Sequence, residues 1–183
     1  MQTYAALLRG INVGGKNLIK MVELATFFRA MGFSEVRTYI QSGNVIFGSN
    51  EPGAAKLTRL LEEALSKTFD YKARVVVRSH AEMKGIVKKA PKGFGGQPEL
   101  YRYDVIFLKE PLTAAEAKKG VTARPGVDTV NVGKGVLYTS RLIERAAQSY
   151  LTRMIGLPIY QDMTIRNWNT TLKLLGMMEE IEG

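Results

Sequence analysis

The segment Gly10–Asn17 combines residue types that bind anions. Its sequence is Gly-Ile-Asn-Val-Gly-Gly-Lys-Asn, and Arg9 and Lys16 bracket the glycines with positive charge. Glycine permits backbone conformations that turn N–H groups inward toward an anion. We therefore expect an anion-binding loop, selective for phosphate or nucleotide-like groups, with candidate residues Arg9, Gly10, Asn12, Gly14, Gly15, Lys16 and Asn17.

The same segment fits the spacing Gly-x-x-x-x-Gly-Lys of the phosphate loop of NTPases, from Gly10 to Lys16. In that loop a serine or threonine follows the lysine and binds magnesium, whereas Asn17 stands here. No apolar run ends in the aspartate that such enzymes also need, which argues against an NTPase. Two interpretations remain: a looser anion-binding loop, or a structural crossover in which Asn12 and Asn17 hydrogen-bond locally.

Two further segments are rich in amide side chains. Gln41–Asn44 falls at a predicted hairpin tip, where it either hydrogen-bonds a base or sugar or only forms the turn. In Arg166–Asn169 the arginine suits a phosphate or carboxylate, one asparagine suits a helix N-cap, and Trp168 suits a core anchor. We expect these segments to join the glycine-rich loop in one site, through Gln41, Ser42, Asn44, Arg166 and Asn167.

The cysteine and histidine counts exclude several chemistries. The chain has no cysteine, so disulfides, iron–sulfur ligation, zinc–thiolate sites and cysteine nucleophiles are absent. His80 is the single histidine, and Ser79 beside it is badly placed for a Ser–His pair. We expect no tightly bound metal and no cofactor. Paired carboxylates are compatible with the composition, but no spacing points to them.

The first half of the chain has apolar periodicities typical of strands and helices in the order βαββαβ. Gly32 suits the end of the first helix, and Ser42–Gly43 suits a tight hairpin. The predicted elements are strands at 3–8, 36–41, 44–47 and 73–78 and helices around 21–28 and 57–69. The residues expected in the core of this half are Phe28, Leu60, Leu61 and Leu65.

The second half repeats this order. Two capping boxes, Ser79 with Glu82 and Thr113 with Glu116, predict helix starts, and the Gly/Pro-rich stretch 91–98 is the best candidate linker. The helix around 83–90 is the connecting helix of the first half. The predicted elements of the second half are strands at 103–108, 129–132, 136–139 and 162–165, helices around 113–119 and 147–154, and a C-terminal helix from about 168. The residues expected in the core are Tyr150, Leu151, Leu172 and Leu175.

These patterns predict an α+β protein with two ferredoxin-like βαββαβ plaits in tandem plus a C-terminal helix. We expect the first ferredoxin-like half with its connecting helix to span residues 1–90. The second half with the C-terminal helix is expected to span residues 91–183. The halves repeat in element order, without residue-level identity.

The net charge of +9 favours phosphate-bearing partners, although charge also serves solubility alone. Positive residues are spread along the chain, so no arm for nucleic acid is apparent. Lys92–Gly95 begins like the aromatic signature of an RNA-recognition motif, but Gly96–Glu99 replaces its apolar continuation. The apolar run at 4–8 is too short for a signal peptide, and no stretch is long enough to span a bilayer. We expect a cytoplasmic protein without a membrane partner.

Three segments carry a resemblance to a known family. They are residues 7–17 (LLRGINVGGKN), 39–45 (YIQSGNV) and 164–170 (TIRNWNT). Together they resemble the bacterial family catalogued as domain of unknown function 1697, and the resemblance runs along nearly the whole chain. It implies a fold of two ferredoxin-like halves. It implies no activity and no catalytic residues.

We therefore expect a non-catalytic binding or regulatory module whose site prefers an anionic small molecule. The first alternative is an enzyme acting on a phosphorylated or nucleotide-like small molecule. The second is a protein that binds nucleic acid non-specifically through its charge. The sequence leaves the oligomeric state open.

Overall fold

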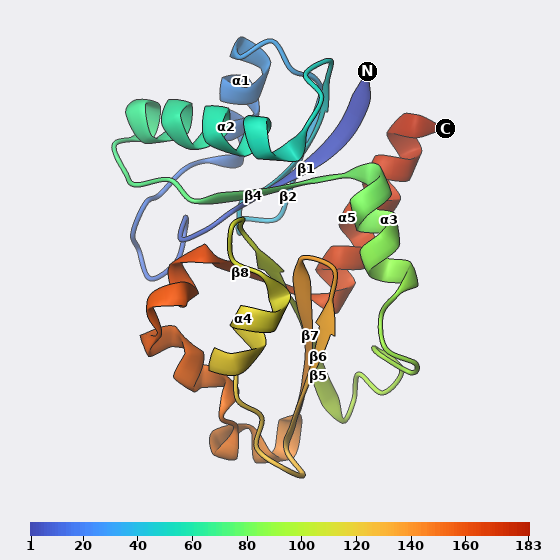
Figure 1. Ribbon diagram of the computed structural model, residues 1–183. Coiled ribbons are helices and arrows are strands. Elements are labelled where there is room, and N and C mark those ends of the chain that lie inside the picture. Colours follow the sequence, from blue (N-terminus) through green and yellow to red (C-terminus); the bar gives the residue numbers. More distant parts are fainter. The chain divides into compact units, whose positions relative to one another are not determined.

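The computed structural model describes residues 1–183, which form two compact units (Figure 1). The first unit consists of Met1–Lys84 with Lys173–Gly183, and the second of Gly85–Leu172. Each unit contains one four-stranded antiparallel sheet. The mixed α+β class predicted from the sequence is therefore confirmed.

The sheet of the first unit has the strand order β2-β3-β1-β4, and helices α1 and α2 lie on the same face of it (Figure 1). The elements in chain order are β1 (Gln2–Leu8), α1 (Met21–Ala30), β2 (Ser34–Tyr39), β3 (Asn44–Ser49), α2 (Ala54–Phe69) and β4 (Val75–Ser79). Phe28 of α1 and the stripe Leu57, Leu61 and Leu65 of α2 are fully buried against the sheet. The prediction was wrong for Leu60, which is 45% exposed because it lies beside this i, i+4 stripe.

The sheet of the second unit has the equivalent strand order β6-β7-β5-β8. Its elements are β5 (Tyr101–Leu108), α4 (Ala114–Gly120), β6 (Asp128–Gly133), β7 (Val136–Leu142), three short 3-10 helices η1 (Ile143–Gln148), η2 (Leu151–Gly156) and η3 (Pro158–Asp162), and β8 (Met163–Asn167). Ala117 of α4 and Leu151 and Met154 of η2 pack on the sheet around Ile106 and Leu137. The predicted capping box of Thr113 and Glu116 is present at the start of α4.

The helix predicted around 147–154 is wrong, because the chain there forms η1 and η2 with an extended residue between them. The carboxylate of Asp128 accepts the Ser149 hydroxyl at 2.7 Å and the Tyr150 backbone N–H at 2.8 Å. These bonds hold Ser149 at ψ 140°, so the helical hydrogen-bond series is interrupted. Tyr150 is half-buried rather than a core residue, whereas Leu151 is buried as predicted.

Two helices belong in part to each unit. The first is α3 (His80–Lys88), which begins with the predicted capping box of Ser79 and Glu82. The second is α5 (Trp168–Glu182), whose residues from Lys173 on pack with the first unit. No helix of the protein has both the length and the apolar character needed to cross a membrane.

The packing of α5 differs from the expected assignment of the C-terminal helix to residues 91–183. Glu180 forms an ion pair with Arg37 at 3.0 Å, because the end of the helix returns to the first sheet. Of the core residues expected in this helix, Leu175 is buried and Leu172 is 41% exposed. The division of the chain into two domains at residues 90 and 91 stays a prediction.

The two sheets correspond residue by residue. Leu8 N–H donates to Gly43 O at 2.8 Å, and Leu108 N–H donates to Gly135 O at 3.0 Å. Just before β4, Arg74 O accepts the Arg9 N–H at 2.9 Å. Just before β8, Asp162 O accepts the Lys109 N–H at 2.8 Å. The registers extend the match: β1 pairs with β4 from Tyr4 on, and β5 pairs with β8 from Asp104 on. Equivalent positions therefore share geometry although their residue types differ.

Candidate functional site

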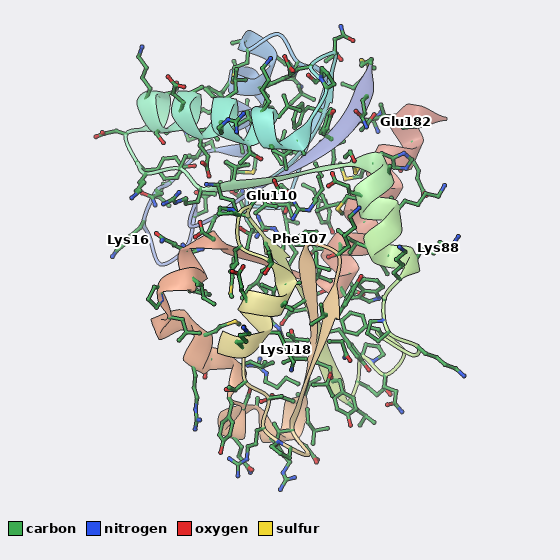
Figure 2. The ribbon with its side chains drawn as sticks, viewed as in Figure 1. Lys16, Lys88, Phe107, Glu110, Lys118 and Glu182 are labelled. Carbon is green, nitrogen blue, oxygen red and sulfur yellow. The ribbon has the colours of Figure 1, made fainter.

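The glycine-rich loop of the first unit is a small, tight hairpin. Val13 pairs with Lys16, and the Lys16 N–H donates to Val13 O at 3.1 Å. Gly14 and Gly15, between them, have φ values of 58° and 74°, which is the combination that a two-residue hairpin turn needs. The loop therefore presents an exposed Lys16 and an exposed glycine backbone at its tip (Figure 2).

The asparagine side chains of this loop hold its conformation. Asn12 Nδ2 donates to Ile19 O and to Gln41 O, both at 2.9 Å, and Asn12 Oδ1 accepts the Ile19 N–H at 2.8 Å. Asn17 Nδ2 donates to Gly10 O at 2.8 Å. These two side chains thus make the local bonds expected of a structural crossover. Anion binding by Lys16 and the glycine backbone stays a prediction.

The predicted hairpin at Gln41–Asn44 lies against this loop. Asn44 is fully buried, and its Nδ2 donates to Tyr39 O and to Ser42 Oγ, both at 3.0 Å. A Cβ on Gly43 would lie 2.6 Å from the Cδ1 atom of Ile11, so this position requires glycine for close approach of the two loops. The structure therefore brings together the first two predicted segments, chiefly by bonds and contacts that stabilise the turns.

The third predicted segment lies in the second unit. Arg166 is 8% exposed, its Nη1 donates to Ile165 O at 2.9 Å, and burial lowers the pKa of its guanidinium to about 10. Adjacent strand residues point to opposite faces of a sheet, so Asn167 points away from Arg166. A single site shared by all three segments stays a prediction, because the other two segments belong to the first unit.

A cleft of about 420 Å³ lies in the second unit, beside the end of β8. It falls within the range of small-molecule sites. At β5 residues 101–103 the strand runs past the end of β8, which pairs with it only from Asp104 on. The β8 side of β5 is thus left by β8 at the cleft, where the Tyr101 N–H donates to Gln97 O at 2.9 Å. The lining residues are Gly95, Pro98, Tyr101, Arg102, Tyr103, Arg141, Ile143, Ala146, Asn167, Trp168 and Asn169.

Two arginines give the cleft its positive charge. Arg102 and Arg141 are directly opposite in the register of β5 and β7, so their side chains leave the same face of the sheet. Arg102 Nε donates to Asp104 Oδ2 at 2.7 Å, and this hydrogen bond raises the pKa of Arg102. Because the carboxylate engages Nε, the terminal nitrogens of Arg102 are left for a ligand. A guanidinium fork matches phosphate and carboxylate geometry.

Aromatic rings form the other wall of the cleft. Phe94 makes T-shaped contacts with Tyr103 and Trp168, each with ring centroids 5.0 Å apart. A Cβ on Gly95 would collide with the Cδ1 and Nε1 atoms of the Trp168 ring, so only glycine fits there. Trp168 is 9% exposed, which confirms the predicted core anchor, and it also lines the cleft. The wall therefore presents ring surface of a kind that packs against a flat ring.

The start of α5 adds hydrogen-bond donors. Asn167 Oδ1 accepts the Asn169 backbone N–H at 2.8 Å, which confirms an asparagine as the cap of this helix. Asn167 and the exposed Asn169 line the cleft, and each carries an amide side chain with N–H donors. The positive end of the helix dipole lies at the same place and favours an anion.

Sequence reasoning missed most of this cleft. Of its lining residues, only Asn167 was among the predicted binding residues, and Trp168 and Asn169 belong to the same predicted segment. The run Tyr-Arg-Tyr-Asp at 101–104 gave one signal, because a basic and an acidic residue begin an otherwise apolar strand. Arg141 gave none, because only the register of β5 and β7 places it opposite Arg102.

The first unit also has a hollow, of about 530 Å³. Its lining combines apolar side chains, such as Met1, Phe33 and Leu57, with polar ones, such as Ser49 and Asn50. The lysine on its rim, Lys56, already pairs with Glu51 at 2.7 Å. This hollow has one basic residue in its lining, whereas the cleft of the second unit has two, Arg102 and Arg141. Nowhere in residues 1–183 do three or more His, Cys, Asp or Glu side chains gather in a way that could hold a metal ion.

The fold and the cleft define a two-unit α+β protein whose second unit has a cleft lined by two arginines, two asparagines and aromatic rings. A family model described as "Protein of unknown function (DUF1697)" matches residues 1–138, and the chain belongs to this family. The resemblance found in the sequence is thus confirmed. The structure of the conserved bacterial protein SP0830 from Streptococcus pneumoniae is similar: it shares 28% sequence identity and a TM-score of 0.85 over 97% of this chain and 98% of that one. The comparison with curated proteins found no match.

Proposed function

We propose that this protein is a binding module for an anionic, nucleotide-like small molecule, and that its site is the cleft of the second unit. The observation that carries the proposal is that the pair Arg102 and Arg141, on one face of the sheet, and the rings of Tyr103 and Trp168 line the same cleft at the end of β8. Two guanidinium groups suit a phosphate, and aromatic faces suit a base. The cleft's volume of about 420 Å³ accommodates a mononucleotide.

The proposal keeps the anion preference inferred from the sequence but moves the main site from the glycine-rich loop to the cleft. The loop's asparagines are engaged in local bonds, whereas the cleft gathers positive charge, amide donors and rings. We also propose that each unit is a ferredoxin-like plait, since both sheets have the strand order expected of one. In the second unit, three 3-10 helices (η1, η2 and η3) take the place of the second helix of such a plait. A cytoplasmic location is consistent with a nucleotide ligand and with a chain that lacks cysteine.

The chain's single tryptophan, Trp168, provides the test, because it lines the cleft. We expect AMP to change Trp168 fluorescence, and adenosine, which lacks the phosphate, to bind at least about tenfold more weakly, as for the loss of one charged hydrogen bond. Arg141→Ala should weaken AMP binding by about 10- to 100-fold on the same grounds. The matched control is Arg59→Ala, which removes an exposed arginine of the first unit.

The outcomes separate the alternatives. Equal losses in Arg141→Ala and Arg59→Ala, with steeply salt-dependent binding of oligonucleotides, would favour non-specific binding of nucleic acid. Chemical conversion of AMP at a rate that Arg141→Ala abolishes would favour the enzyme. Absence of binding by AMP, ribose 5-phosphate and inorganic phosphate alike would reject the proposal.

A further inference from the structure

The first unit contains a built-in example of how the open edge of a central strand takes an anion. In that unit β1 also runs past the end of β4, which pairs with it only from Tyr4 on. The backbone N–H of Thr3, at this open edge, donates to Glu182 Oε1 at 3.2 Å. Glu182 is at the last turn of α5 (Figure 2). A carboxylate is thus seated where the neighbouring strand has ended.

The correspondence of the two sheets identifies the equivalent N–H in the second unit. Arg9 N–H points to the β4 side of β1, and Lys109 N–H points to the β8 side of β5. Alternate N–H groups of an antiparallel strand point to the same side. The Thr3 N–H therefore points to the β4 side, and it donates there to Glu182 Oε1. By the same alternation, the Tyr103 N–H points to the β8 side, where β8 has ended and the cleft lies.

We infer that the backbone N–H of Tyr103 is the seat of the ligand's oxyanion, equivalent to the seat that Glu182 occupies at Thr3. This inference rests on the proposed function and adds to it the atom that the anion contacts. Arg102 lies next to this N–H in β5, and Arg141 lies opposite Arg102. The oxyanion then lies in the plane of the sheet, with a guanidinium pair beside it. A ring attached to the anion extends toward Trp168.

The ligand class that this N–H suits is an oxyanion, either a carboxylate or a phosphate, with an attached ring. Glu182 shows that a carboxylate fits this geometry, and its hydrogen bond with Thr3 lowers the pKa of Glu182. Charge-assisted bonds of this type also form with phosphate. The two units differ in the charge beside this N–H. In the second unit Arg102 pairs with Arg141 across β5 and β7. The equivalent pair in the first unit is Gln2 and Ser49, which carry no charge. An external anion therefore has its stronger seat in the second unit.

The direct test follows two backbone amides by NMR spectroscopy in the intact protein. We use AMP as the phosphate-bearing probe and benzoate as the carboxylate-bearing probe, so that their relative affinities distinguish the two sources of the oxyanion. Binding should shift the Tyr103 amide proton downfield and slow its exchange with solvent. The Thr3 amide should not respond, because Glu182 already occupies its seat.

Glu182→Ala is the matched variant for the first seat. It should speed hydrogen exchange at Thr3 by up to about tenfold, the range for one hydrogen bond, and leave Tyr103 as it is. For the second seat, Tyr103→Pro removes the N–H, and Tyr103→Ala removes the ring but keeps the N–H. Proline is tolerated where a strand N–H faces an open edge. We expect Tyr103→Pro to weaken AMP binding at least about tenfold more than Tyr103→Ala does, as for a lost charged hydrogen bond.

The failure of this inference is distinguishable from failure of the proposed function. If AMP changes Trp168 fluorescence while the Tyr103 amide neither shifts nor gains protection, the seat is wrong and the binding module stands. If neither probe affects Trp168 or Tyr103, both are rejected. If the proline variant does not fold, the amide measurement on the unaltered protein still decides.

Discussion

At the open edge of the first sheet stand Gln2, Ser49 and Thr3, whereas the equivalent positions of the second sheet are Arg102, Arg141 and Tyr103. In the first unit a side chain of the protein, Glu182, fills the gap beside the central strand. In the second unit the gap is a cleft. The comparison shows that each edge is uncovered because β4 and β8 stop pairing before the central strand ends, and that in the first unit a side chain of the protein then takes this place.

The largest effect on the difference between the two units is expected at Gly95, because the cleft wall has no room for a side chain there. Gly93 and Gly95 both have positive φ, of 78° and 82°, but only a Cβ on Gly95 would collide with Trp168. We expect Gly95→Ala to lower the free energy of unfolding by about 1–3 kcal/mol more than Gly93→Ala, the usual cost of overpacking. Urea unfolding measures both variants, and the backbone strain they share cancels. Equal losses would mean that the wall yields without cost.

In the first unit the corresponding structural residue is Asn12, which fixes the glycine-rich loop. Its side chain makes three hydrogen bonds, whereas Asn17 makes one. We expect Asn12→Ala to lower the free energy of unfolding by about 1–2 kcal/mol, because it leaves the backbone of Ile19 without partners, and Asn17→Ala to cost less. Both variants should bind AMP normally. Reduced AMP binding in Asn12→Ala, with the fold intact, would assign the ligand to the first unit.

The smallest expected effect is at Lys16, at the exposed tip of the same loop. We expect Lys16→Ala to change the free energy of unfolding by less than about 0.5 kcal/mol, as is usual for a surface residue. Its affinity for AMP should equal that of the unaltered protein in a Trp168 fluorescence titration. A tenfold loss of affinity would instead support the anion-binding loop predicted from the sequence and sharpen the difference between the two units.

Local patterns in the sequence predicted the elements better than the site. Apolar periodicity located the strands and the buried stripe of α2, and the capping boxes marked the starts of α3 and α4. The break between η1 and η2 depends on Asp128, which is distant along the chain from Ser149. Such a contact has no local signature, so a continuous helix was expected there.

The cleft could not be predicted from the sequence, because its residues come together only through the register of strand pairing in the second sheet. Arg102 and Arg141 become neighbours only when β5 and β7 pair, and Asp104 meets Asn167 only when β5 and β8 pair. A shift of one residue in either pairing would send these side chains to the opposite face. The glycine-rich loop, by contrast, was conspicuous in the sequence because positive φ values demand glycine or asparagine, whether or not a ligand binds.

The division of the first unit along the chain has a consequence for synthesis. Domains generally fold as they emerge from the ribosome, from the N-terminus onward. Met1–Lys84 emerges early, but Lys173–Gly183, which completes the same unit, emerges only after the whole second unit. During this interval Glu182 is absent and the N–H of Thr3 has no carboxylate beside it. The nascent protein therefore exposes an uncovered strand edge, a template for pairing with other chains, until translation has reached α5.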